Sequence, residues 1–174
     1  MKYVLSILIT LFLMSCAPIY VNYDYEKTAD FSKYKTYQYF GDMDTGLSEL
    51  DAKRLLDVLD ERLKANGFSI SEHPDFLIDI KSVEYQNPQR ETVGVGVGGG
   101  GGNVGGGISI GIPVGQGSMT REIVFDFVDS SNNQLFWQAK SESNFNLKST
   151  PEKREARFMA IVEKVLKKYP PKSK

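Results

Sequence analysis

"TREIVFDFVDSSNNQLFWQAKSESNFN", residues 120–146, holds two alternating apolar stretches on either side of a polar segment. Ile123, Phe125 and Phe127 recur at every second position, which is the period of a strand with one buried face. The residues "DSSNNQ" at 129–134 are typical turn formers, and the apolar stretch resumes after them. The segment therefore predicts a β-hairpin.

Three further strands are predicted upstream of this hairpin. Residues 19–26, "IYVNYDYE", place Tyr23 and Tyr25 on one side and polar residues on the other. Residues 27–40 turn into a second aromatic alternation, and residues 75–85, "DFLIDIKSVEY", form a longer strand pattern. A tyrosine cluster could stack on carbohydrate, but aromatic pairing between neighbouring strands is commoner, so we expect these rings to be structural.

Two amphipathic helices complete the pattern. The first is predicted from the capping pair Ser48 and Asp51 to Gly67, which supplies a left-handed end. Its apolar face repeats every fourth residue, at Leu55, Leu59 and Leu63. Its solvated face is predicted to carry Lys53, Arg54, Asp57, Asp60, Glu61 and Lys64. The second helix is predicted after Thr150 and Pro151, with an apolar stripe through Phe158, Val162, Val165 and Tyr169.

Strands grouped between two helices favour a mostly antiparallel sheet with both helices packed on one face. The chain has 174 residues, which is room for one such domain and a leader but not for a second full domain. We therefore predict a single α+β domain over residues 16–174, with a glycine-rich β-hairpin inserted at residues 92–117.

Residues 1–15 are predicted to be a signal peptide. Lys2 precedes an uncharged apolar run, Tyr3–Met14, which is too short to span a bilayer but has the length of a signal-peptide core. The leader ends in "LMSC", residues 13–16, which resembles the lipobox of bacterial lipoproteins. The resemblance implies cleavage before Cys16 and lipidation of that cysteine.

Cys16 is the only cysteine of the chain, so it has no intramolecular disulfide partner. Two or more acyl chains hold a protein stably on a membrane, and the remaining chain can then be soluble. Ala17 stands where an aspartate would favour retention in the inner membrane, and no acidic run follows it. We therefore expect an outer-membrane anchor with the domain facing the periplasm.

The segment "VGVGVGGGGGNVGGGISIGIPVGQG", residues 93–117, contains 13 of the 16 glycines. Its aliphatic residues stay in phase with period two on both sides of a glycine tip, residues 99–107, which predicts two strand-like arms. A phosphate-binding glycine loop would need a following helix, and here strands follow. The bare face of the predicted hairpin is the candidate interaction surface, formed by Gly94, Gly96, Gly98, Gly111 and Gly115.

Four segments, taken in order, resemble the bacterial lipoproteins of domain-of-unknown-function family 4136. They are "YDYEKTADFSKYKTYQYF" at 23–40, "HPDFLIDI" at 73–80, the glycine-rich middle, and "LFWQAKSES" at 135–143 before a final helix. The resemblance covers nearly the whole mature chain and implies a lipid-anchored envelope protein with a compact α+β domain. It implies no reaction, because the family carries no catalytic residues to transfer.

Few residues of the chain are suited to catalysis or metal binding. His73 is the only histidine and precedes Pro74 in a predicted loop, so we expect neither a hydrolase triad nor a zinc site. Paired acids for glycoside hydrolysis could come from four strand carboxylates, Asp24, Asp79, Glu122 and Asp126. Alternation of carboxylates with apolar residues is, however, typical of a solvated sheet face. We predict no enzyme activity, no cofactor and no metal.

The charges nearly balance, with 21 basic and 22 acidic residues, so net charge implies no nucleic-acid partner. We predict a lipid-anchored cell-envelope protein with a non-catalytic binding or structural role. Its expected partners are the membrane, through the anchor, and an envelope protein or peptidoglycan. Two alternatives remain: an envelope enzyme with a carboxylate site, and an accessory factor in outer-membrane assembly.

Overall fold

The structure is a computed structural model that describes residues 18–86 and 119–171. The predicted signal peptide, the lipidation site Cys16 and the glycine-rich segment lie outside the described residues. The candidate interaction surface formed by Gly94, Gly96, Gly98, Gly111 and Gly115 lies there too, so these assignments stay predictions.

Six strands form one sheet in the order β1-β6-β5-β4-β2-β3. They are β1 (Ile19–Tyr25), β2 (Thr36–Tyr39), β3 (Ser69–Ile70), β4 (Phe76–Gln86), β5 (Met119–Asp129) and β6 (Leu135–Phe145). The β5–β6 hairpin is antiparallel, and its outer neighbours β4 and β1 also pair antiparallel to it. The predicted hairpin is therefore confirmed, and both of its strands lie inside the sheet, between β1 and β4.

The short strand β2 runs parallel to β3 and β4, a pairing that the sequence pattern does not predict. A parallel pair needs a crossover long enough to return the chain to the same end of the sheet. The helix α2 (Glu49–Ala65) supplies this crossover between β2 and β4. The sheet is consequently mixed but mostly antiparallel.

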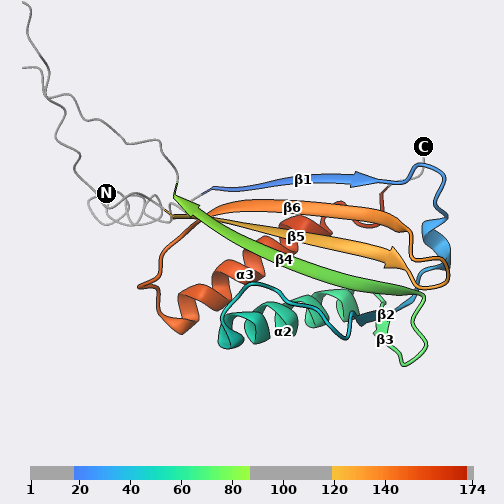
Figure 1. Cartoon of the computed structure of the whole chain (residues 1–174), viewed down its shortest axis with the longest axis horizontal. Coiled ribbons are helices and arrows are strands. Elements are labelled where there is room, and N and C mark those ends of the chain that lie inside the picture. Colours follow the sequence, from blue (N-terminus) through green and yellow to red (C-terminus); the bar gives the residue numbers. More distant parts are fainter. Residues whose placement is uncertain (1–17, 87–118, 172–174) are drawn as a thin grey trace, which may run out of the picture.

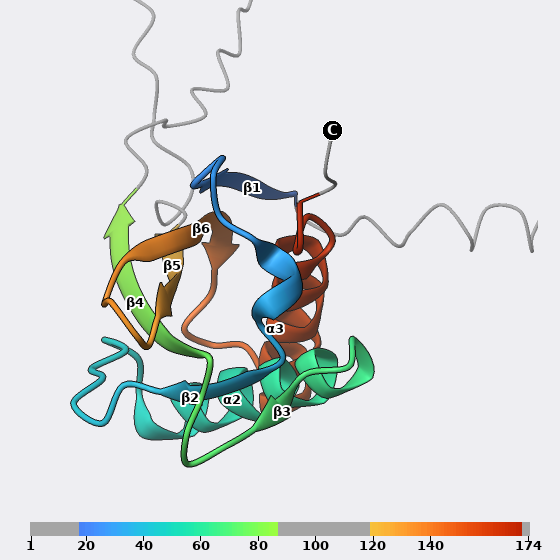
Figure 2. The ribbon, with the colours of Figure 1, turned by 90° about the vertical axis from the view of Figure 1, so that its right-hand side faces the viewer.

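Both α-helices, α2 and α3 (Pro151–Leu166), pack on one face of the sheet (Figure 1). Seen from one end, the sheet bends from β1 round to β2 and β3 (Figure 2). A single turn of 3-10 helix, η1 (Phe31–Lys33), follows β1. These elements confirm the predicted α+β fold class.

Each helix begins where its capping residue predicts. The side-chain oxygen of Ser48 accepts a hydrogen bond from the Asp51 amide, and that of Thr150 accepts one from the Lys153 amide. The last turn of α2 ends before Gly67, which has a positive φ of 89°.

Alternation along the strands decides which side chains enter the core. The helix-facing residues Ile123, Phe125 and Phe127 are fully buried, as the period of two predicts. They meet the buried leucine stripe of α2 and the buried apolar residues of α3. The stripe of the second helix was predicted to run to Tyr169, but α3 ends at Leu166 and Tyr169 lies beyond it. At the end of the domain that lies beyond the last turn of α3, the ring centroid of Tyr169 is 4.9 Å from that of Phe127.

Asp60 of α2 was predicted on the solvated face of the helix, and this was wrong. It is half-buried, and its Oδ1 accepts hydrogen bonds from the hydroxyls of Tyr37 at 2.8 Å and Tyr39 at 2.6 Å. Burial, followed by the hydrogen bond to Asp60, raises the pKa of both tyrosines. The pairing therefore joins α2 to β2 through neutral phenols.

No helix within the described ranges is long and apolar enough to span a membrane.

Two glycines with positive φ offer a matched test of the fold. Gly46 has a φ of 65°, and a Cβ built on it would lie 2.6 Å from the carbonyl oxygen of Ser82 in β4. Gly67 has a φ of 89° with open space around the same position. We expect Gly67→Ala to lower the free energy of unfolding by about 1–2 kcal/mol, from the left-handed backbone alone.

The Gly46→Ala change adds a clash with the backbone, and we expect a loss of roughly 3 kcal/mol. Urea unfolding of both variants measures the difference. Equal losses would show that the contact between Gly46 and Ser82 does not constrain the loop.

Candidate functional site

A cavity of about 670 Å³ opens between the start of α3 and the end of the sheet where β5 begins and β6 ends. Its lining includes five basic side chains, Arg121, Lys148, Lys153, Arg154 and Arg157. It also includes the apolar side chains of Met119, Phe145, Leu147, Phe158 and Ile161. None of the described residues that line this basic cavity is acidic.

Register and helix periodicity bring the basic residues together. Arg121 lies on the helix-facing side of β5, two residues before Ile123, at a position where the pattern would otherwise place an apolar residue. Lys153, Arg154 and Arg157 lie on the first two turns of α3, and Lys148 belongs to the loop before it. The cavity therefore lies where the sheet end meets the positive pole of the helix dipole.

Asp51 is the acceptor around which the arginines gather, and its side chain is only 1% exposed. Its Oδ1 lies 3.1 Å from Nη1 of Arg54. Its Oδ2 lies 2.7 Å from Nη1 of Arg154 and 3.5 Å from Nη1 of Arg121. One carboxylate thus ties α2 to both β5 and α3, whereas Asp51 was predicted only as part of a helix cap.

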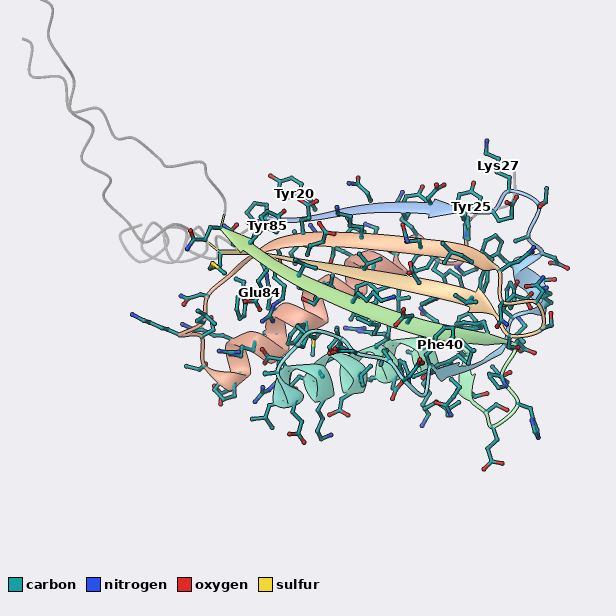
Figure 3. All side chains as sticks on the ribbon, in the orientation of Figure 1. Tyr20, Tyr25, Lys27, Phe40, Glu84 and Tyr85 are labelled. Atoms are coloured by element: carbon teal, nitrogen blue, oxygen red, sulfur yellow. The ribbon has the colours of Figure 1, made fainter. Side chains whose placement is uncertain are left out.

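Besides its ion pair with Asp51, Arg121 contacts the side chains of Glu84 and Phe145. Its Nη2 and Nε donate to Oε1 of Glu84 at 2.6 and 3.1 Å, and its guanidinium lies 3.4 Å from the ring centroid of Phe145. Glu84 extends from the helix side of β4, opposite to its neighbour Tyr85 (Figure 3). These contacts fix the guanidinium at the wall of the cavity.

Arg154 connects the same network to the loop before α3. Its Nη2 donates to the carbonyl oxygen of Leu147 at 2.6 Å, and its Nε donates to that of Ser149 at 3.1 Å. Because Nη1 is bonded to Asp51, the guanidinium holds this loop against the helix. The loop before α3, which forms one wall of the cavity, is therefore held in place by hydrogen bonds.

The four carboxylates considered for catalysis lie on the opposite face of the sheet. Asp79 and Asp126 are partners across β4 and β5, and Asp24 lies in the same row, opposite Gln138. Glu122 is 2.7 Å from Nζ of Lys140. None of the four lines the basic cavity. The structure therefore places three of them in one row across the sheet and Glu122 in another row of the same open face.

Other candidate ligands are also dispersed. His73 is exposed in the loop before β4. Within residues 18–86 and 119–171, no group of three or more histidine, cysteine, aspartate or glutamate side chains could hold a metal ion.

A smaller cavity of about 180 Å³ lies beside Asp129, at the other end of β5. Burial would raise the pKa of Asp129, but hydrogen bonds from Lys33, Ser131 and Tyr34 outweigh it and hold this pKa well below its usual range. The Lys33 Nζ lies 2.5 Å from Oδ2. We interpret this cluster as a structural clamp between η1 and the β5–β6 turn.

One feature of the sequence could have pointed to the basic cavity. Lys153 and Arg154 occupy the first turn of α3, where the helix dipole favours acidic side chains. Lys153 and Arg157 are four residues apart, a spacing at which like charges repel on a helix. Local rules are often broken where a site is functional, and Arg121 and Lys148 join only through the tertiary structure.

The fold and the cavity define an α+β domain with a basic pocket at one end of its sheet. The chain belongs to the family described as Domain of unknown function (DUF4136), which matches residues 21–171. The family resemblance noted in the sequence is therefore confirmed. A search of curated proteins found no match.

The fold is shared with solved structures, of which two are described. The PelC dodecamer of Paraburkholderia phytofirmans has a TM-score of 0.51 and 12% identity, over 86% of this chain and 95% of that chain. A PDZ domain protein of Parabacteroides distasonis has a TM-score of 0.51 and 13% identity, over 98% of this chain and 40% of that chain. At these identities the likeness concerns the fold alone.

The Asp51 network predicts a large loss of stability when its acceptor is removed. In Asp51→Asn, the buried guanidinium of Arg121 and that of Arg154 lose a charged partner, which costs about 3–5 kcal/mol in comparable buried pairs. The control is Asp57→Asn, which breaks only an exposed pair with Lys53 on the same helix. There we expect less than about 0.5 kcal/mol. Chemical denaturation of both variants measures these values, and similar losses would contradict the role of Asp51.

The lowered pKa of Asp129 predicts a pH-dependent contribution to stability. The carboxylate stabilises the fold above its unfolded pKa of about 3.9, and this stabilisation is lost as the pH falls toward the lower folded pKa. We expect Asp129→Asn to cost about 2 kcal/mol at pH 7, the size of a lost charged hydrogen bond.

The difference from wild type should shrink as the pH falls below about 4. Urea unfolding at several pH values measures it, with Asp42→Asn as the exposed control. A difference that stays constant with pH would contradict the assignment.

Proposed function

We propose that this protein is a lipid-anchored cell-envelope protein with a non-catalytic binding role, and that the basic cavity is its binding site. The anchor is Cys16, and the proposed location is the periplasmic face of the outer membrane. The proposal combines the lipobox-like leader with the position of the cavity in the fold.

The observation that carries the proposal is the contact between the start of the described chain and α3. Nη2 of Arg157, which lines the cavity, donates to the carbonyl oxygen of Pro18 at 3.3 Å. Nζ of Lys164 donates to the carbonyl oxygen of Ile19 at 3.1 Å. The chain therefore enters the domain next to the cavity.

The distance from this entry point to the anchor is short. Consecutive Cα atoms are about 3.8 Å apart, so the two residues from Pro18 to Cys16 reach at most about 8 Å. A lipid on Cys16 would thus hold the cavity end of the domain close to the membrane surface. This supports a binding site that meets ligands at or near the membrane.

The glycine-rich segment leaves the sheet at the same end. β4 ends at Gln86 and β5 begins at Met119, which are register partners, and Met119 lines the cavity. The proposed interaction surface of this segment is therefore connected to the sheet beside the proposed binding site. A partner in the envelope could contact both.

The anchor is tested by Cys16→Ser, compared with Ser15→Ala, which keeps a small residue before the cysteine. In a bacterium with an outer membrane, we expect Cys16→Ser to leave the membrane fraction and to lose incorporation of a labelled fatty acid. The Ser15→Ala control should keep both. Retention of Cys16→Ser in the membrane after alkaline washing would overturn the anchoring proposal.

A further inference from the structure

The geometry points to an anionic amphiphile as the ligand of the basic cavity: an oxyanion head, phosphate or carboxylate, carried on an apolar chain. The inference deepens the binding role proposed above and rests on it, because it names what that site would bind. Phospholipids with a net negative charge and free fatty acids both have this chemistry.

The cavity has the size and the mixed lining that such a ligand needs. Its volume of about 670 Å³ falls within the range of small-molecule sites. Its accessible apolar lining comes from Leu147, which is 64% exposed, and from the partly exposed Met119 and Phe145, with the buried Phe158 and Ile161 of α3 behind them. An apolar chain can therefore be buried against one part of the lining while a charged head meets another.

Two of the basic side chains that line the cavity have no acidic partner among the described residues. Asp51 and Glu84 pair with Arg121 and Arg154. Lys148 and Lys153 line the same cavity, are exposed, and form no ion pair with a described residue. An anion would add the missing partner.

Two repulsive interactions act at this end of α3. Lys153 and Arg157 repel each other at a spacing of four residues, and Lys153 also opposes the helix dipole. A bound oxyanion would attract both side chains and offset this repulsion, and its negative charge would also suit the positive pole of the α3 dipole. The same residues that weaken the empty helix end would therefore strengthen the occupied one.

The cavity is organised before any ligand binds. Arg154 holds the loop through the carbonyl oxygens of Leu147 and Ser149, and Arg121 is fixed between Glu84 and Phe145. Little side-chain entropy would be lost at these two positions on binding. A free inorganic anion would use the charges but leave the apolar lining empty, so we expect it to bind more weakly.

The test is native mass spectrometry of the full chain, released from a non-ionic detergent. The probes are dioctanoyl phosphatidylglycerol, decanoate, dioctanoyl phosphatidylcholine and inorganic phosphate. We expect at least one of the two anionic amphiphiles to bind about tenfold or more tightly than either phosphatidylcholine or phosphate. Binding of phosphatidylglycerol alone would indicate that the natural ligand is a phospholipid. Binding of decanoate alone would indicate that it is a fatty acid.

Variants assign the binding to the cavity. Lys148→Gln combined with Lys153→Gln removes two exposed charges from the cavity and should weaken binding of the anionic amphiphile by about tenfold. Lys53→Gln combined with Lys64→Gln removes the same charge from exposed positions on α2 and should change binding by less than about twofold.

Three results would overturn the inference: no adduct with either anionic amphiphile, equal affinity for phosphatidylcholine or phosphate, or equal losses in the two double variants. The measurement does not depend on the anchor, because it is made in detergent. A failure of Cys16→Ser to release the protein would therefore overturn the anchoring proposal and leave this result in place.

Discussion

Asp51 is the constraint on which one end of this domain depends. Its carboxylate is almost fully buried and accepts from Arg54, Arg121 and Arg154, which come from α2, β5 and α3. A buried charge is costly unless it is paired and hydrogen-bonded, so the two helices and the sheet must meet where these partners converge. The same geometry turns Arg121 and Arg154 toward the basic cavity, which links the stability of the fold to the chemistry of the proposed site.

The two ends of the domain are built on different physical principles. At one end, Tyr169 closes the core against Phe127, Phe76 and Trp137, where packing of large rings stabilises the contact between helix and sheet. At the other end, charged hydrogen bonds replace this packing around Asp51. The basic cavity lies at this second end, and Arg121 and Arg154 form part of its lining.

Sequence periodicity predicted both helices, every described strand except the two-residue β3, and most of the faces that they bury. It failed where a residue's partner lies far away in the chain. Asp60 fits the polar face of an isolated helix, yet it accepts bonds from two tyrosines of β2. The parallel pairing of β2 with β4 was also missed, because alternation reports which face is buried but not which strand lies alongside.

The sequence by itself determined the fold class, the start of each helix and most of the core, because these follow from local periods and from capping residues such as Ser48 and Thr150. It also contained a sign of the site, since cations in the first turn of α3 oppose the helix dipole. Only the tertiary structure decided that Arg121 joins them, 32 positions before Lys153 in the chain. The physical reason is that the shape and lining of a cavity depend on how far apart the elements around it lie. A local sequence pattern does not specify these distances.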